Sequence, residues 1–359
     1  MFQTICSQFR IKGEFESCTP YGEGHIHRTY LVRTREGAEE YNYILQGLHP
    51  TAFSNIPKLQ DNIMRVTDFI KSKILEAGGD PEKETMSVIR TVKGNTYYFD
   101  GQMNYRMLTF IPNTMTFQSA TVELFRESGW AFGNFAYLLS AFDCTTLYET
   151  IPNFHHTPCR LEALRRAISA DICQRVEGVR KEIHFALSHA KLAPLIVDKL
   201  ASGALPLRVT HNDTKLNNVL FDATTKKPVA VIDLDTVMAG SVCYDFGDAI
   251  RFGCNTAAED ETDLSLVQFS LPHFEAFCQG YLKGTQNTLT ATEREMLPYG
   301  AMMMTYECGM RFLTDYLEGD VYFHTAYPTH NLVRARTQFK LLSEMEAHYD
   351  DMVHIVHQN

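Results

Sequence analysis

Residues 208–235 read RVTHNDTKLNNVLFDATTKKPVAVIDLD, and the order of apolar and polar residues in this stretch decides the fold class. Two short β-prone segments, 219–222 and 228–232, flank the polar segment 223–227. Two such segments separated by a polar turn are typical of a β-hairpin. The stretch therefore predicts an antiparallel hairpin with its turn near Thr225 and Lys226.

The hairpin predicts which side chains meet at its open end. With that turn, Val219 is expected to face Ile232, and Asn218 to face Asp233. Cross-strand neighbours lie about 5 Å apart, so an amide oxygen and a carboxylate would come together. Mg²⁺ prefers such hard oxygen ligands and keeps waters and substrate phosphates in its other positions. The predicted geometry would suit a Mg²⁺ ion.

A second carboxylate, Asp213, lies five residues before Asn218. Beside a metal–nucleotide complex, a carboxylate can accept the proton of an attacking hydroxyl during phosphoryl transfer. The alternative is that Asp213, Asn218 and Asp233 are only turn and cap residues, for which Asp and Asn are favoured. Their expected convergence through one hairpin favours the chemical interpretation.

The rest of the chain predicts a β-rich part followed by a helical part. Before Pro112, one segment has a helical period, residues 57–75. The β-prone segments there are residues 27–33, 41–46, 87–92, 96–100 and 105–110. After Pro112 the better helix candidates are residues 123–142, 161–168, 183–187 and 293–316. A small β-rich lobe joined to a larger helical lobe would form a cleft, where ligand sites are common.

Composition limits the function further. The 359 residues carry 33 Lys and Arg against 43 Asp and Glu, a formal net charge of −10, which argues against a nucleic-acid binder. The nine cysteines show no C-x-x-C spacing, which favours reduced thiols in a cytoplasmic protein. No apolar run approaches the roughly 20 residues of a membrane span, and no signal-peptide pattern is found. We therefore expect a cytoplasmic protein of one bilobal unit or two domains.

The catalytic stretch also resembles a known family. His211-Asn-Asp213-x-x-x-x-Asn218, followed by a strand ending in Ile232-Asp233, is similar to the catalytic loop and metal aspartate of the aminoglycoside phosphotransferase and choline kinase branch of the protein-kinase-like fold. The resemblance implies a bilobal α+β fold, with a small β-rich, nucleotide-binding N-lobe over residues 1–112 and a larger helical C-lobe over residues 113–359. It implies Asp213 as catalytic base and Asn218 and Asp233 as Mg²⁺ ligands.

The match extends over most of the chain. Further segments resemble the N-acetylhexosamine 1-kinases, namely residues 21–30, 43–46, 210–235, 245–253, 307–313, 316–320 and 330–334. This resemblance implies ATP-dependent phosphorylation of the anomeric hydroxyl of N-acetylglucosamine or N-acetylgalactosamine, in carbohydrate salvage. ATP and the sugar are then the expected partners, without nucleic acid, membrane or an obligate protein partner. The gluco and galacto epimers fit this expectation equally.

The same resemblance implies nucleotide contacts. Gly22 and Gly24 would let backbone N–H groups approach the phosphates, although a simple turn would also use them. Lys215 matches a lysine that contacts the γ-phosphate in protein kinases; a solvated lysine is the alternative. Gln46 stands where protein kinases carry the phosphate-binding lysine of the third strand. A neutral amide cannot supply that charge, so Mg²⁺ and another cation must compensate, or nucleotide binding is weaker.

Three residues of the matched segments are candidate sugar contacts: His25, Asp235 and Arg311. A neutral sugar requires paired polar groups rather than net charge. Arg311 has an alternative as the partner of Glu307 or Asp315 at helical spacing, and Asp235 as a brace of the metal site. His25 has an alternative as an ordinary loop histidine.

Asp245-Phe246-Gly247 spells the metal-binding motif of protein kinases but lies 32 residues after Asp213, whereas Asp233 lies 20 after it. We expect Asp245 to order the catalytic loop or to cap a helix over residues 249–252, and Asp233 to be the metal ligand.

Two other functions stay open. One is a kinase for another small alcohol, namely choline, homoserine or an aminoglycoside. The acidic run 257–263 would attract a cationic acceptor, with a solvated helix start as its alternative. Gln46 would suit a pseudokinase that binds nucleotide without turnover.

Overall fold

The computed structural model describes residues 1–22, 27–49 and 55–359, and it divides into two compact units. Each unit is built from three separate segments of the sequence. The first contains Met1–Thr116, Ala141–Pro152 and Val219–Met238, and the second contains Phe117–Ser140, Asn153–Asn218 and Ala239–Asn359. The expected functional division at residues 112 and 113 stays a prediction, because these units are defined by contacts and not by what they bind.

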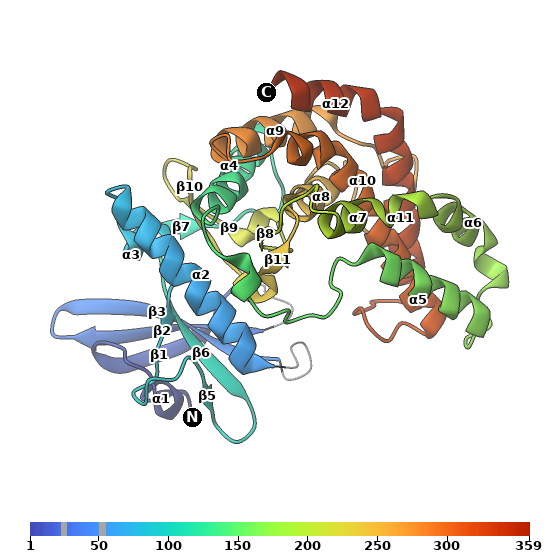
Figure 1. The fold of residues 1–359 in the computed structure, drawn as a ribbon. Coiled ribbons are helices and arrows are strands. Elements are labelled where there is room, and N and C mark those ends of the chain that lie inside the picture. Colours follow the sequence, from blue (N-terminus) through green and yellow to red (C-terminus); the bar gives the residue numbers. More distant parts are fainter. Residues whose placement is uncertain (23–26, 50–54) are drawn as a thin grey trace. The chain divides into compact units, whose positions relative to one another are not determined.

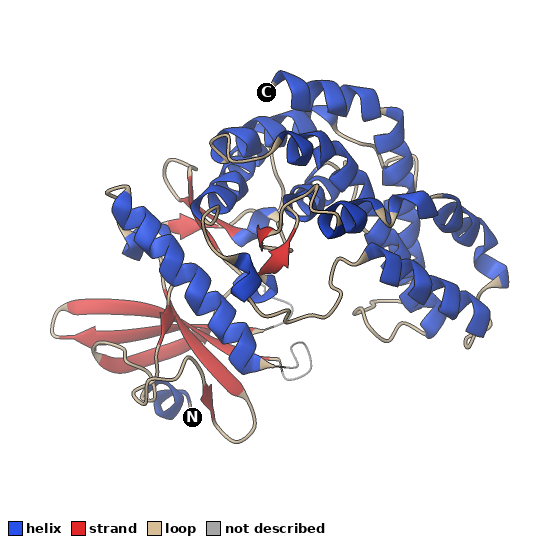
Figure 2. Ribbon diagram, viewed as in Figure 1, coloured by secondary structure: helices blue, strands red, loops and turns tan. Residues whose placement is uncertain are grey.

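The first unit contains an antiparallel sheet of six strands (Figures 1 and 2). The strands are β1 (Glu14–Pro20), β2 (Arg28–Glu36), β3 (Glu39–Leu48), β4 (Val88–Ile89), β5 (Tyr98–Phe99) and β6 (Asn104–Thr109). Their order is β1-β2-β3-β6-β4, with β5 also paired to β6. Strands β2 and β3, expected at residues 27–33 and 41–46, pair as a hairpin; its tight turn places Gly37 at a φ of 62°, which favours glycine.

Three helices accompany this sheet: α1 (Phe2–Cys6), α2 (Ile56–Glu76) and α3 (Pro81–Glu84). Helix α2 confirms the helical period of the sequence and begins after Asn55, whose side chain accepts a hydrogen bond from the backbone of Lys58. On α2, the buried Asn62 donates to the carbonyl oxygens of Tyr148 and Val237. These bonds join the three chain segments of the first unit.

The predicted hairpin at residues 219–232 is present, but its predicted register is wrong by one residue. It consists of β9 (Val219–Asp222) and β10 (Pro228–Val231), with β7 (Thr114–Met115) on the other edge of β9. Val219 pairs with Val231 rather than with Ile232. The pairing is irregular between Pro228 and Ala230, where the proline has no N–H to donate to the ladder.

The second unit is mostly helical. Its helices are α4 (Val122–Leu138), α5 (Thr157–Ala170), α6 (Arg180–Ser188), α7 (Leu195–Ala201), α8 (Val242–Gly253), α9 (Leu271–Gly284), α10 (Ala291–Glu318), α11 (His330–Ala347) and α12 (Tyr349–Gln358). Strand β8 (Arg208–Thr210) pairs with β11 (Met238–Gly240). Helix α10 packs against α5, α8 and α11 (Figure 1). The expected division into a β-rich part and a larger helical part is confirmed.

Glycines bring α4 and α9 into close contact. Two lie on each helix, four residues apart: Gly129 and Gly133 on α4, and Gly280 and Gly284 on α9. A Cβ atom at Gly280 would lie 1.9 Å from the carbonyl oxygen of Arg126. The absence of side chains therefore lets the two backbones approach each other, and α4 is held firmly against α9.

Across residues 1–22, 27–49 and 55–359, no helix combines the length and the apolar character that a bilayer crossing requires.

Candidate functional site

The segment after β8 is held by two carboxylates of α8. The Asp245 carboxylate accepts hydrogen bonds from the backbone N–H groups of His211, at 2.8 Å, and Asn212, at 2.7 Å. The backbone N–H of Thr214 donates to Asp248 at 3.0 Å, and its hydroxyl donates to the carbonyl oxygen of Asp245 at 2.6 Å. Helix α8 therefore fixes the backbone on both sides of Asp213.

One of the two roles expected for Asp245, ordering this loop, is confirmed, and the other, capping a helix over residues 249–252, is wrong. Helix α8 already begins at Val242, and the hydroxyl of Ser241 caps it. A Cβ atom at Gly247 would lie 2.3 Å from the carbonyl oxygen of Gly300 on α10. The glycine of the Asp-Phe-Gly sequence thus serves the packing of α8 against α10.

The pKa values of the two α8 carboxylates are shifted in opposite directions. Burial raises the pKa of Asp245 to about 6, against the lowering effects of His211 and the two backbone N–H groups. Burial also opposes ionisation of Asp248, but the charges of Arg251 and Lys215 outweigh it and hold the pKa of Asp248 below its ordinary value. The loop is therefore ordered by one carboxylate that titrates near neutrality and one that stays ionised.

Three of the predicted site residues meet in the second unit. The ammonium group of Lys215 lies 2.8 Å from Oδ1 of Asp213, and the amide nitrogen of Asn218 lies 3.2 Å from Oδ2. The same nitrogen donates to the backbone oxygen of Asp213 at 2.8 Å. Burial lowers the pKa of Lys215, but the adjacent Asp213 charge raises it above the ordinary lysine value. Lys215 is thus a paired cation with a partly exposed side chain, and its contact with a γ-phosphate stays a prediction.

The contacts of Asn218 bear on metal binding. Because its amide nitrogen is directed to Asp213, its amide oxygen lies on the other side of the group, as an oxygen ligand for a divalent cation requires. Asp233 follows β10 and has a left-handed backbone, with φ of 62°. This conformation is uncommon outside glycine and is found at ligand sites. Asp233 belongs to the first unit and Asn218 to the second, so a shared Mg²⁺ site stays a prediction.

Within the part of the chain that the structure describes, no group of three or more His, Cys, Asp or Glu side chains is arranged for a metal ion. The predicted Mg²⁺ site is not such a group, because it would consist of one amide, one carboxylate and the phosphates of the nucleotide.

Asp235 lies in a buried network of the first unit. The guanidinium of Arg106 donates to both of its carboxylate oxygens, at 2.5 and 2.6 Å, and His27 Nε2 lies 3.2 Å from Oδ2. Burial would raise the pKa of Asp235, but the Arg106 charge and the His27 contact hold it far below its ordinary value. Both oxygens are engaged inside the protein, which favours the bracing role over contact with a sugar.

The nucleotide-loop candidates lie in the connection between β1 and β2. Gly22 has a φ of 76° and free space around its Cβ position. Gly24 and His25 lie outside the described residues. Gln46 lies on β3, the third strand, as the sequence comparison with kinases requires. Its amide oxygen accepts a hydrogen bond from Nε of Arg106 at 2.8 Å, and its nitrogen donates to Thr29.

Arg311 lies on α10 and faces aromatic rings. Its guanidinium lies 5.6 Å from the ring centres of Phe154 and Tyr322 and 5.4 Å from that of Phe323. The Tyr322 side of this group is open to solvent, with the residue 68 % exposed. The sequence reasoning missed these rings; the available signal was the aromatic pair 322–323 directly after the Gly319-Asp320 helix end.

The acidic neighbours of Arg311 on α10 have other partners. Glu307 bonds to His155 at 2.9 Å and to the Thr157 hydroxyl at 2.6 Å. Asp315 accepts the backbone N–H groups of residues 321–323. The ion pair proposed as the alternative for Arg311 is thus replaced by the cation–aromatic contacts.

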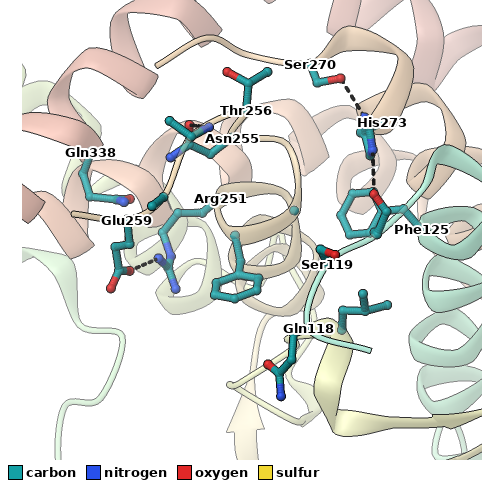
Figure 3. Close-up of a pocket in the computed structure, with 16 residues that line it drawn as sticks. Gln118, Ser119, Phe125, Arg251, Asn255, Thr256, Glu259, Ser270, His273 and Gln338 are labelled. Atoms are coloured by element: carbon teal, nitrogen blue, oxygen red, sulfur yellow. Dashed lines mark hydrogen bonds and ion pairs between the residues drawn. The ribbon is translucent and has the colours of Figure 1, made fainter. Parts of the chain in front are cut away.

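The second unit contains a cavity of about 560 Å³ (Figure 3). Leu216, three residues after Asp213, and Arg251 are among the residues that line it. Arg251 forms ion pairs with Asp248 at 2.9 Å and Glu259 at 3.0 Å. None of the predicted site residues lines this cavity, so it is a candidate ligand space that the sequence did not indicate.

The sequence profile of the phosphotransferase enzyme family matches residues 17–277. The chain belongs to this family. The superfamily inferred from the catalytic stretch is thereby confirmed, whereas the finer resemblance to N-acetylhexosamine 1-kinases remains a proposal.

Solved structures resemble this phosphotransferase-family protein over nearly its whole length. A choline kinase from Cryptosporidium parvum matches with a TM-score of 0.61 and 13% identity, covering 99% of this chain and 98% of its own. An aminoglycoside phosphotransferase from Alicyclobacillus acidocaldarius matches with a TM-score of 0.59 and 13% identity, covering 99% and 96%. A spectinomycin phosphotransferase in complex with ADP and spectinomycin has a TM-score of 0.51 and 12% identity, covering 96% and 93%. At such identities the likeness concerns the fold, and the bilobal α+β expectation is confirmed.

Proposed function

We propose that the protein is an ATP-dependent kinase that phosphorylates the anomeric hydroxyl of an N-acetylhexosamine, giving the sugar 1-phosphate and ADP. The observation that carries the kinase chemistry is Asp213 held between Lys215 and Asn218 on a loop fixed by α8. Membership of the phosphotransferase family supports the reaction class, and the ADP complex of the spectinomycin phosphotransferase supports the use of ATP. The choice of sugar rests on the extended sequence resemblance.

In this proposal the protein mainly positions and neutralises, since phosphoryl transfer requires little other chemistry from side chains. Asp213 accepts the proton of the sugar C1 hydroxyl. The hydroxyl oxygen forms a bond to the γ-phosphorus of ATP while the bond between that phosphorus and the ADP oxygen breaks. Lys215, already a cation at Asp213, contacts the γ-phosphate, while backbone groups near Gly22 and Gly24 contact the phosphates. Asn218 and Asp233 would hold Mg²⁺, which would supply positive charge to the phosphates.

A neutral acceptor is supported by the state of the acidic run 257–263. Glu259 is paired with Arg251 at 3.0 Å and with Arg334 at 3.6 Å, and Asp260 lies 3.2 Å from His330. Two arginines thus neutralise Glu259, and Asp260 is directed to His330. These carboxylates therefore offer a quaternary ammonium or an aminoglycoside less than the sequence suggests.

Arg311 supports a sugar in a different way. A guanidinium among aromatic rings supplies donors for hydroxyl or acetamido oxygens next to apolar faces that suit a pyranose ring. We propose Arg311 and His25 as sugar contacts, and Asp235 as a brace rather than a contact.

The test is a coupled measurement of ATP consumption with N-acetylglucosamine, N-acetylgalactosamine, choline, homoserine and an aminoglycoside. Phosphorus NMR of the product distinguishes a 1-phosphate from phosphate on another hydroxyl. We expect turnover with an N-acetylhexosamine, and a loss of about 10²–10⁴-fold in kcat for Asp213→Asn with ADP binding retained. The exposed Asp263, which caps its own turn, provides the control Asp263→Asn.

Three outcomes would contradict parts of the proposal. Turnover only with a cationic alcohol would overturn the sugar and keep the kinase. Nucleotide binding without turnover of any acceptor would favour the pseudokinase. Full activity of Asp213→Asn would overturn the assignment of the base.

A further inference from the structure

A buried cation lies next to the strand position where protein kinases carry a lysine. Gln46 on β3 and Arg106 on β6 are paired residues of adjacent strands. Nε of Arg106 donates to the amide oxygen of Gln46 at 2.8 Å, and Arg106 is 1 % exposed. The positive charge absent at Gln46 is therefore present one strand away, in the same layer of the sheet.

The partner of this cation also differs from the protein-kinase arrangement, in which the lysine pairs with a glutamate of the neighbouring helix. The buried polar residues of α2 include the amides Gln60 and Asn62, and the acids of α2, Asp61, Asp68 and Glu76, are not buried. Arg106 instead donates two hydrogen bonds to the carboxylate of Asp235. The ion pair of this unit thus connects the sheet to the segment after β10.

His27 adds a third contact to the same carboxylate. The backbone N–H of His49 donates to Nδ1 of His27 at 3.2 Å, so the ring hydrogen is on Nε2, which faces Asp235 at 3.2 Å. His27 directly precedes β2, so the carboxylate is held by one group at the start of β2 and one on β6. With 4 % exposure, Asp235 is fixed in position rather than solvated.

Asp235, which Arg106 and His27 hold, lies close in sequence to the predicted metal ligand Asp233. Asp235 lies in the 3₁₀ turn η5 (Leu234–Thr236), two residues after Asp233. Asp233 has a left-handed backbone conformation, which is uncommon for residues other than glycine. Because Asp235 is held on one side and β10 on the other, the backbone at Asp233 is constrained from both sides.

We propose that Arg106 is a positioning residue for the nucleotide-bound divalent cation: it holds Asp235 and thereby aims Asp233. The inference rests on the proposed kinase function but not on the identity of the acceptor. Stability alone is a poor explanation of the pair, because well-packed apolar residues often replace a buried ion pair without loss of stability.

Because apolar residues can replace a buried ion pair, the positioning role can be tested separately from stability. Arg106→Met combined with Asp235→Leu removes both charges together and leaves no unpaired buried ion. We expect the nucleotide-free protein to stay folded, although Gln46 and His27 each lose a hydrogen-bond partner. The affinity for Mn²⁺ in the presence of ADP, followed by electron paramagnetic resonance, should fall about 10–100-fold, as for other partners that orient metal ligands.

Three further variants calibrate this result. Arg106→Lys keeps the charge but loses the two-pronged geometry, and should lower the Mn²⁺ affinity by a smaller factor. Asp233→Asn should abolish tight Mn²⁺ binding. Arg175→Lys disrupts the Arg175–Asp320 pair of the second unit, at 2.6 Å, and should leave the Mn²⁺ affinity unchanged.

The outcomes separate this inference from the proposed function. Loss of Mn²⁺ binding in Asp233→Asn, with wild-type affinity in both Arg106 variants, would overturn the positioning role alone. Wild-type affinity in Asp233→Asn would overturn the metal site and the positioning role together. If the double variant does not fold, Arg106→Lys decides, and a wild-type affinity there overturns the inference.

Discussion

Gly280→Ala should loosen the packing of α4 against α9. The new Cβ atom would lie 1.9 Å from the carbonyl oxygen of Arg126 and 2.8 Å from the backbone nitrogen of Trp130, whereas real Cβ contacts stay above 3.0 Å. The helices must therefore separate locally by about 1.1 Å, and neither obstacle is a side chain that can turn away. Overpacking costs about 1–3 kcal/mol, or more against backbone, and the helix preference of alanine returns up to about 1 kcal/mol.

The expected net loss is about 2 kcal/mol, which lowers the unfolding temperature by roughly 4–8 °C for a unit of this size. Scanning calorimetry measures it, and Gly178→Ala is the control, because nothing lies within 4 Å of its Cβ position. Kinase activity should fall as well, since Phe132 and Phe135 of α4 lie 5.6 and 5.9 Å from the ring of His211. A Gly280→Ala protein that melts within 1 °C of wild type would refute the reasoning.

Two further predictions concern buried polar groups. The pKa of Asp245 is raised to about 6 from an ordinary 3.8, so the folded state binds the extra proton between these values and stability falls by roughly 3 kcal/mol as pH rises from about 4 to about 6. Asp245→Asn should lack this fall in urea midpoints measured across pH 4–7, and equal slopes for both proteins would contradict it. Asn62→Ala removes hydrogen bonds to Tyr148 and Val237 and should cost about 2–4 kcal/mol in chemical denaturation. Its control is Gln60→Leu, because neither end of the buried Gln60 amide has a hydrogen-bond partner among the described residues, and a loss as large as that of Asn62→Ala would contradict the account.

Elements with a local cause were predictable from the sequence. Helix α2 follows from its apolar period and from the Gly78-Gly79 stop, and the β2–β3 hairpin follows from two β-prone segments around a glycine turn. The meeting of Asp213 and Asn218 also follows from local spacing, because both lie on one short loop.

Features that depend on distant parts of the chain were not predictable in the same way. The register of β9 and β10 is displaced by Pro228, whose effect depends on how the ladder forms around it. The partners of Arg311 come from segments about 157 and 12 residues away, which periodicity along α10 cannot reveal. Arg106 did carry a signal, since a charged residue within the apolar strand 105–110 requires a buried partner, but the identity of that partner lies 129 residues on.

The discontinuous construction of the first unit has a consequence for synthesis on the ribosome. Its six-stranded sheet lies within residues 1–116, but the segment that completes the unit ends at Met238, after about two thirds of these 359 residues have been translated. Until then the nascent sheet carries the Arg106 guanidinium without the carboxylate that neutralises it. Burying the unpaired guanidinium of Arg106 is unfavourable. We therefore expect the first unit to fold late, whereas amino-terminal domains generally fold first.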